Sequence, residues 1–137
     1  MHSCSTLVIS CIDYRFQDVI HKFLNKNVPG DYDLVSVVGA CKSLIKKGER
    51  EFLIKQIGIS SKLHKIKRVY LINHQDCGAY GNEDFLDPIS EKKRHFKDLK
   101  KAKETLYKIF PNVENIKLFF LNYPDSNAKK AVVEQIR

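Results

Sequence analysis

Apolar residues along the chain fall into two kinds of pattern, short β-branched runs and longer stretches with helical spacing. The short runs predict strands at residues 5–10 (STLVIS), 32–40 (YDLVSVVGA), 67–74 (KRVYLINH) and 115–123 (NIKLFFLNY). The run at 67–74 lacks a clean alternation of apolar and polar residues, which is typical of a strand covered on both faces.

Between these runs, apolar residues recur at steps of three and four, as they do on one face of a helix. The predicted helices cover residues 15–27, 42–58, 91–110 and 126–137. Their predicted inner residues include Phe16, Val19, Ile20, Phe23 and Leu24, then Leu44, Ile45, Phe52, Leu53 and Ile57, then Phe96, Leu99, Ala102, Leu106 and Ile109. Gly58 fits the C-terminal stop of the second helix.

The order of these elements predicts the fold class. Strands that alternate with helices favour an α/β fold of three layers, a central, mainly parallel β-sheet of about four strands with helices on both faces. A chain of 137 residues has the usual size of one domain, so we expect a single domain over residues 1–137. In such sheets, sites lie beyond the carboxyl ends of neighbouring strands.

The composition narrows the class of protein. Hydrophobic residues make up 43% and charged residues 29%, as in globular proteins. No apolar run approaches the roughly 20 residues that cross a bilayer, and no secretory signal opens the sequence, so we expect a cytoplasmic protein without a membrane partner. In that setting the four cysteines favour metal binding or free thiols over disulfides.

The net charge of +8 raises the question of a nucleic-acid partner. Many lysines lie on the outward face of the predicted helix 91–110, without interleaved aromatic residues on which bases could stack. No helix-turn-helix or zinc-finger spacing occurs. We interpret the charge as a solvated surface and expect no nucleic-acid partner.

Two short motifs place reactive side chains at strand ends. Cys11 follows the first predicted strand, and His74 and Cys77 follow the third. Thiolate and imidazole are zinc ligands, and a catalytic zinc site uses three protein ligands and leaves the fourth position open. If the first and third strands are neighbours, the three side chains can meet at one ion. The competing interpretation is that both cysteines are buried as small hydrophobic groups.

The segment CIDYR adds a charged pair beside the first cysteine. If it stays extended, Cys11, Asp13 and Arg15 point to the same side. Arg15 can then hold the carboxylate of Asp13 in a charge-assisted contact, and the ionised carboxylate can accept a hydrogen bond from a zinc-bound water. A purely structural ion pair would use the same residues.

These motifs carry a family resemblance. Cys-x-Asp-x-Arg at 11–15, followed by His-x-x-Cys-Gly at 74–78, resembles the signature of the β-class carbonic anhydrases, particularly the shorter members. The element order is similar over nearly the whole chain, whereas close matches are confined to the two motifs and a few residues around Gly39.

The resemblance implies a β-carbonic anhydrase-like fold and a zinc enzyme, with one Zn²⁺ per chain, that reversibly hydrates carbon dioxide to bicarbonate by a zinc-bound hydroxide. It implies that Cys11, His74 and Cys77 are the zinc ligands and that Asp13 and Arg15 form the catalytic dyad. It also implies a homodimer or a higher homo-oligomer.

The chain departs from the family pattern in three places. It has SVVGA where the family commonly has Arg-Asn-Ala-Gly, and it has Tyr14 where serine or alanine is usual. The residues before Cys11 include no glutamine, although many members carry an N-terminal helical arm and a glutamine that reaches towards substrate. Two other functions therefore stay open: a zinc-binding protein of this fold with little hydratase activity, and a hydrolase of carbonyl sulfide or carbon disulfide.

Several other candidate residues belong neither to the predicted zinc ligands nor to the Asp13–Arg15 pair. Cys4 and Cys41 are expected to be structural or incidental, and Asp76 to cap its turn. Four further histidines are expected to be solvated, and any of them could shuttle protons: His2, His21, His64 and His95.

Overall fold

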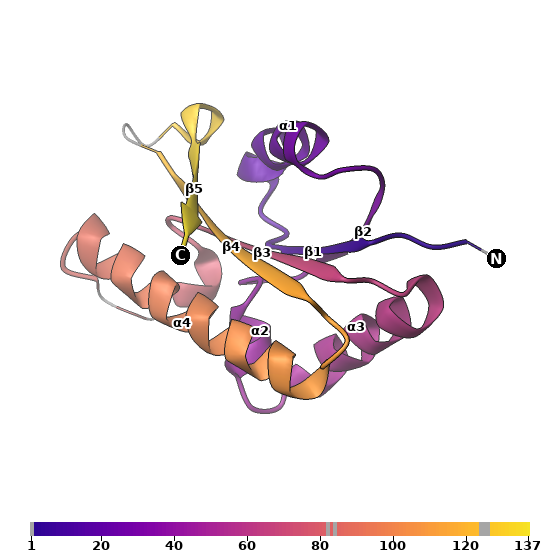
Figure 1. Cartoon of the computed structure of the whole chain (residues 1–137). Helices are drawn as coiled ribbons and strands as arrows, with labels where there is room; N and C mark the ends of the chain where they lie inside the picture. Colours follow the sequence, from indigo (N-terminus) through magenta and orange to yellow (C-terminus); the bar gives the residue numbers. More distant parts are fainter. Residues whose placement is uncertain (1, 82, 84, 124–126) are drawn as a thin grey trace.

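The structure, a computed structural model, describes residues 2–81, 83, 85–123 and 127–137. The described residues form a five-stranded sheet in the order β2-β1-β3-β4-β5 (Figure 1). The strands are β1 (Thr6–Ser10), β2 (Tyr32–Ser36), β3 (Arg68–His74), β4 (Asn115–Asn122) and β5 (Val132–Ile136). The first four are parallel, and β5 pairs antiparallel with β4.

Helices cover both faces of this sheet (Figure 1). On one face lies α1 (Gln17–Asn27), and on the other lie α2 (Lys42–Ile45), α3 (Arg50–His64) and α4 (Pro88–Ile109). Short 3-10 turns are η1 (Tyr14–Phe16), η2 (Gly78–Tyr80) and η3 (Ala128–Lys130). The predicted three-layer α/β fold with a mainly parallel sheet is confirmed.

The core explains why the central strands are continuous apolar runs. Neighbouring side chains of a strand point to opposite faces of the sheet. In β1, Leu7 and Ile9 belong to the core shared with α2, α3 and α4, whereas Val8 packs with Phe16 and Leu24 on the α1 side. Both faces of the strand are therefore buried, which removes the alternation of apolar and polar residues.

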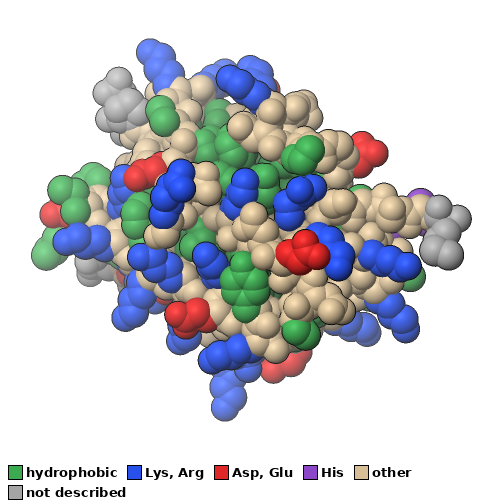
Figure 2. Space-filling model, viewed as in Figure 1, with side chains coloured by type: hydrophobic (Ala, Val, Ile, Leu, Met, Phe, Trp, Pro, Cys, Tyr) green, Lys and Arg blue, Asp and Glu red, His purple; other side chains and the backbone are tan. Residues whose placement is uncertain are grey.

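The lysine-rich helix begins earlier than the pattern predicts. α4 starts at Pro88, and the carboxylate of Asp87 caps it by accepting a hydrogen bond from the Ser90 N–H at 2.7 Å. Of its predicted inner side chains, Leu99, Ala102 and Leu106 are buried, Phe96 is partly buried, and Ile109 is 39% exposed. Lysine and arginine side chains are spread over the face seen in Figure 2, with acidic and apolar side chains between them.

The C-terminal segment is a strand, and the prediction of a helix over 126–137 is wrong. The first residue of that range lies outside the described residues, and β5 places Ile136 opposite Leu118 of β4. The β-branched Val132 and Val133 favour an extended backbone. Pairing also satisfies backbone groups of β4 that would otherwise form an open sheet edge. The sheet therefore has one strand more than predicted.

The helix predicted at 42–58 is interrupted. α2 and α3 are joined by a turn in which Gly48 has a φ of +96°, a conformation that suits glycine. Gly58 lies inside α3, which ends instead at Lys65 with a φ of +58°. Because the break changes the register of the apolar positions, Phe52 is 64% exposed rather than internal.

No helix within the described ranges is long and apolar enough to cross a membrane.

Candidate metal centre

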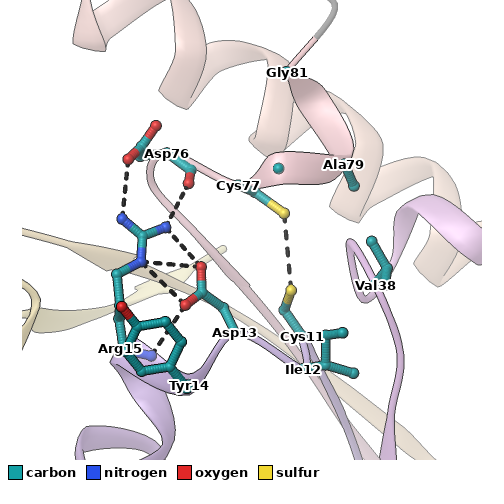
Figure 3. A pocket seen from close by; sticks show the side chains of 11 residues that line it. Cys11, Ile12, Asp13, Tyr14, Arg15, Val38, Asp76, Cys77, Ala79 and Gly81 are labelled. Carbon is teal, nitrogen blue, oxygen red and sulfur yellow. Dashed lines mark hydrogen bonds and ion pairs between the residues drawn. The ribbon is translucent and has the colours of Figure 1, made fainter.

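The topology brings the two motifs together. β1 and β3 are neighbours, with Ser10 opposite Ile72, so their carboxyl ends lie side by side. The donor atoms of Cys11, His74 and Cys77 all lie within 4.8 Å of one another, and all three residues are buried. The two sulfur atoms face each other at 3.9 Å (Figure 3).

His74 presents one nitrogen to this cluster. Its Nδ1 is 2.7 Å from the carbonyl oxygen of Gln75, so Nδ1 carries the proton and donates it, which leaves the lone pair on Nε2. Among the described residues, that buried Nε2 has no hydrogen-bond partner. Phe16 stacks on the ring with centroids 4.3 Å apart and fixes its orientation. The imidazole is therefore set up as an acceptor or a metal ligand.

Position 39, beside the cluster, requires a glycine. Its φ is +77°, and a Cβ added there would lie 2.6 Å from the Cβ of Ala79. Its N–H donates to the sulfur of Cys11 at 3.4 Å. Both the backbone conformation and the close approach exclude larger residues at this position.

The two thiols do not ionise independently. The hydrogen bond from Cys77 lowers the pKa of Cys11 to about 4, against the effect of burial, with further help from His74 and the Gly39 N–H. The pKa of Cys77 is raised, because its thiol is the donor to the Cys11 thiolate and is itself buried. One thiolate therefore forms readily, and a cation between the sulfurs would replace the remaining proton.

Asp13 and Arg15 form a tight pair at the edge of the cluster (Figure 3). The Arg15 backbone N–H and Nε each donate to Oδ1 of Asp13 at 3.0 Å, and Nη2 donates to Oδ2 at 2.6 Å. These bonds lower the pKa of Asp13, against a partial burial that would raise it. The segment is not extended throughout, because Asp13 caps the turn η1 in which Arg15 lies. Oδ2 of Asp13 is 3.8 Å from Nε2 of His74.

Asp76 supports this pair from the loop between the ligands, which corrects the prediction that it caps its own turn. Its carboxylate accepts from Nη1 of Arg15 at 3.0 Å and from the Tyr123 hydroxyl at 3.2 Å, and its carbonyl accepts from Nη2 at 2.9 Å. The Asp76 N–H donates to Glu91 at 2.8 Å. No local spacing signals contacts between residues so far apart in the chain, so sequence reasoning missed Tyr123 and Glu91.

A pocket of about 640 Å³ opens over the thiols. Its lining combines Asp13 and Arg15 with the apolar side chains of Ile12, Val38 and Ala79. Val38 and Ala79 flank the two cysteines on the side away from Asp13 (Figure 3). One wall can thus receive a small apolar molecule while the opposite wall carries charge.

Two histidines are not solvated as predicted. His64 is half-buried against Asp33, and His95 is fully buried under the η2 turn. Asn73 lies 2.9 Å from Nδ1 of His95, and Tyr80 packs on the ring with centroids 4.1 Å apart. Burial, with the nearby positive charges, lowers the pKa of His95 to about 3. His95 therefore stays neutral near neutral pH and is a poor proton shuttle.

This burial predicts a pH dependence of stability. Below the ordinary histidine pKa of 6.5, the unfolded chain binds a proton at His95 that the folded chain does not bind until pH about 3. As the pH is lowered from about 6.5 to about 3, this group should reduce the free energy of unfolding by up to about 1.4 kcal/mol per pH unit. In urea unfolding with a chelator present, His95→Gln should show a correspondingly shallower decline. His21→Gln, at an exposed histidine, is the control, and equal slopes in the two variants would contradict the assignment.

The donor set fits a zinc-like ion. Two thiols and one imidazole with a free lone pair are the ligands that zinc prefers, and the unpartnered Nε2 of His74 is the atom that such an ion would satisfy. Three protein ligands beside an open pocket would leave one coordination position for water or substrate.

Comparisons with known proteins identify the family of the chain. The family model described as "Putative carbonic anhydrase" matches residues 1–134. A protein of Rickettsia bellii (strain RML369-C), described as uncharacterized, is 30% identical over 122 residues, which cover 83% of this chain and 74% of that protein.

Solved structures show the same fold. A carbonic anhydrase from Streptococcus mutans has a TM-score of 0.64 at 16% identity, over 96% of this chain and 81% of that chain. The apo form of a carbon disulfide hydrolase has a TM-score of 0.60 at 15% identity, over 98% of this chain and 79% of that chain. With the family match over nearly its whole length, the chain belongs to the β-carbonic anhydrase family.

Proposed function

We propose that this protein is a zinc enzyme that reversibly hydrates carbon dioxide to bicarbonate, with Cys11, His74 and Cys77 holding the ion. One observation carries the proposal: the three donor atoms converge within 4.8 Å, and the free Nε2 of His74 lies 3.8 Å from an ionised Asp13. In the reaction, water adds its oxygen to the carbon of carbon dioxide, and one proton leaves to solvent.

Zinc bound here would lower the pKa of a water in its open position to about 7 and so supply a hydroxide nucleophile. Asp13 would accept a hydrogen bond from that nucleophile and aim its lone pair at the substrate. Arg15 holds the carboxylate still through both its backbone and its guanidinium, and Asp76 holds the guanidinium from the other side. The group that orients the nucleophile is thereby preorganised.

The charges support this assignment. A divalent ion would balance two thiolates, and the Arg15 guanidinium lies between the carboxylates of Asp13 and Asp76. Arg15 therefore does more than position Asp13, since without it a carboxylate beside two thiolates would leave the centre negative and would itself be free to approach the ion. The apolar wall of Ile12 and Val38 would hold carbon dioxide without competing hydrogen bonds.

The apolar wall of the pocket is also compatible with a second class of substrate. With Gly39 matched, Ser36 and Val37 stand where the family commonly has arginine and asparagine, and neither lines the pocket, whose wall here is the apolar Val38. Carbonyl sulfide and carbon disulfide are apolar and linear like carbon dioxide, and an apolar wall would also accept them. A zinc-binding protein with little hydratase activity remains the alternative if no substrate turns over.

We also propose that the protein assembles as a homodimer or a higher homo-oligomer. Apolar side chains are exposed around the mouth of the pocket, with Ile12 and Val38 each 54% and Tyr14 86% exposed. A second copy would cover them at a favourable hydrophobic gain.

Stopped-flow carbon dioxide hydration on zinc-loaded protein tests the function. We expect turnover well above the buffer rate, inhibited by a zinc-binding anion, with carbonyl sulfide and carbon disulfide hydrolysis measured in parallel. Light scattering on the same sample reports the oligomeric state. Full zinc loading without turnover of any of the three substrates from neutral to alkaline pH would overturn the enzyme proposal.

A further inference from the structure

We propose that Cys4, Asp33 and His64, with His2 as a fourth donor, form a second metal site for a divalent zinc-like cation. Their donor atoms, other than those of His2, lie within 4.8 Å of one another. The cluster lies near the amino ends of the strands, whereas the Cys11 centre follows their carboxyl ends. The two sites therefore share no residue.

Three separate segments supply these residues, and the backbone holds the segments together. Cys4 precedes β1, Asp33 lies in β2 opposite Leu7 of β1, and His64 ends α3. The N–H of Cys4 donates to the carbonyl oxygen of His64 at 3.2 Å. Because sheet pairing and this bond fix the Cα positions, little chain ordering would be needed to bind an ion.

The side chains are already gathered around one point. Nδ1 of His64 and the hydroxyl of Ser60 each lie 2.6 Å from the same oxygen of Asp33. The ring of His2 packs against that of His64 with centroids 4.8 Å apart. The side chains of His64 and Asp33 are 24% and 27% exposed, so an ion could enter from solvent.

The donor chemistry favours a borderline metal over calcium or magnesium. Sulfur, imidazole nitrogen and carboxylate oxygen are all zinc ligands, whereas calcium and magnesium prefer oxygen alone. Zinc bond lengths place tetrahedral ligand atoms roughly 3.3–3.8 Å apart. The donor atoms furthest apart, at up to 4.8 Å, would have to approach by about 1 Å, whereas Nδ1 of His64 and the Asp33 oxygen, 2.6 Å apart, would have to separate by about 0.7 Å. The ion would take the place of the proton between His64 and Asp33 and release the Cys4 thiol proton.

An ion pair alone explains only part of this cluster. It accounts for His64 with Asp33. Within the described residues, however, the hydrogen bond of the Cys4 thiol is a weak contact with the Thr6 carbonyl at 3.5 Å, and His2 is exposed. A shared cation would use all four. It would also tie residues 2–4 to the end of α3, so the expected consequence is a metal-dependent rise in thermal stability.

Zinc titration of the whole chain, stripped of metal and monitored by competition with a chromophoric chelator, tests the proposal. The wild type should bind two zinc ions per chain. Asp33→Asn and His64→Gln should each lose one, and Cys77→Ser should lose the other. Zinc bound at the Cys4 cluster should raise the melting temperature. This rise should persist in Cys77→Ser and disappear in His64→Gln.

His21→Gln is the matched control, because it removes an exposed histidine from another part of the surface and should keep both ions. Cobalt loaded into Cys77→Ser should give thiolate-to-metal charge transfer that Cys4→Ser abolishes in the same background. The proposal is overturned if Cys77→Ser binds no zinc, or if His64→Gln and Asp33→Asn bind as many zinc ions as the wild type. Neither outcome depends on hydratase activity, so this test is independent of the test of the proposed function.

Discussion

Replacing Cys77 with serine is expected to remove the ion from the Cys11 centre and to abolish hydration. The serine hydroxyl is not ionised near neutral pH and is a poor zinc ligand. The substitution also removes the hydrogen bond that most lowers the pKa of Cys11, so the remaining thiol becomes harder to deprotonate. The loss of affinity should exceed the roughly 10–100-fold that removing a mere outer partner of a ligand costs. Metal analysis after dialysis, together with stopped-flow hydration, measures both effects.

The control for this variant is Cys41→Ser. Cys41 is fully buried, and burial raises the pKa of its thiol to about 12, so it is an unreactive core group outside the metal cluster. This substitution should lower stability by leaving a polar group in an apolar core, yet keep the ion and the activity per folded molecule. Should Cys77→Ser keep both its metal and its turnover, the ligand assignment would have to be abandoned.

The convergence of Cys11, His74 and Cys77 could be predicted on the condition that the first and third strands are neighbours. Parallel strands align their carboxyl ends, and a switch in strand order makes β1 and β3 neighbours. Residues directly after those strands must therefore meet, whatever the details of packing. The proximity of Cys11, His74 and Cys77 follows from that rule, and their role as metal ligands stays a proposal.

The supports of the site were not predictable in the same way. Asp76 and Tyr123 reach Arg15 across long stretches of chain, and nothing in their neighbours marks those contacts. His95 looked solvated because it stands among lysines in α4, but its own position on the helix faces the core. The contacts of Asp76 and Tyr123 depend on how the loops pack on the sheet, which no local pattern encodes. The burial of His95 did have a local signal, because it lies four residues before Leu99 on the apolar face of the helix.

The last strand, β5, also could not be predicted from its own sequence. Residues 127–137 contain helix-forming lysine, alanine and glutamate as well as two adjacent valines, so local preference is divided. The unpaired edge of β4 decides the outcome, since pairing there satisfies backbone groups and buries Ile136. A preference set by a partner strand cannot be obtained from the segment by itself.

Replacing Asp13 with asparagine is expected to leave the ion bound and to lower kcat/KM by about 10²–10⁴-fold, the usual contribution of a positioned acid–base group. Asparagine has nearly the same shape, but its amide must turn an N–H group towards Arg15 or towards the nucleophile. Either orientation loses an acceptor, and the Arg15 guanidinium keeps Asp76 as its one remaining carboxylate partner among the described residues. Stopped-flow hydration and metal analysis on the same preparation separate the loss of turnover from the loss of metal.

The pH profile of the hydration rate shows whether Asp13 positions the nucleophile or itself gains and loses a proton. Because Arg15 lowers the pKa of Asp13 below its usual 3.8, the carboxylate is ionised throughout the neutral range, and its stabilising contact is lost only as pH falls through the lowered value. Between neutral and alkaline pH, Asp13→Asn should therefore reduce the rate without changing the shape of its rise with pH. Asp18→Asn, at an exposed carboxylate that pairs with Lys22 at 3.0 Å, should behave as wild type. If Asp13→Asn has full activity, the nucleophile is oriented by another group, and the Asp13–Arg15 pair serves only to shape the turn after β1.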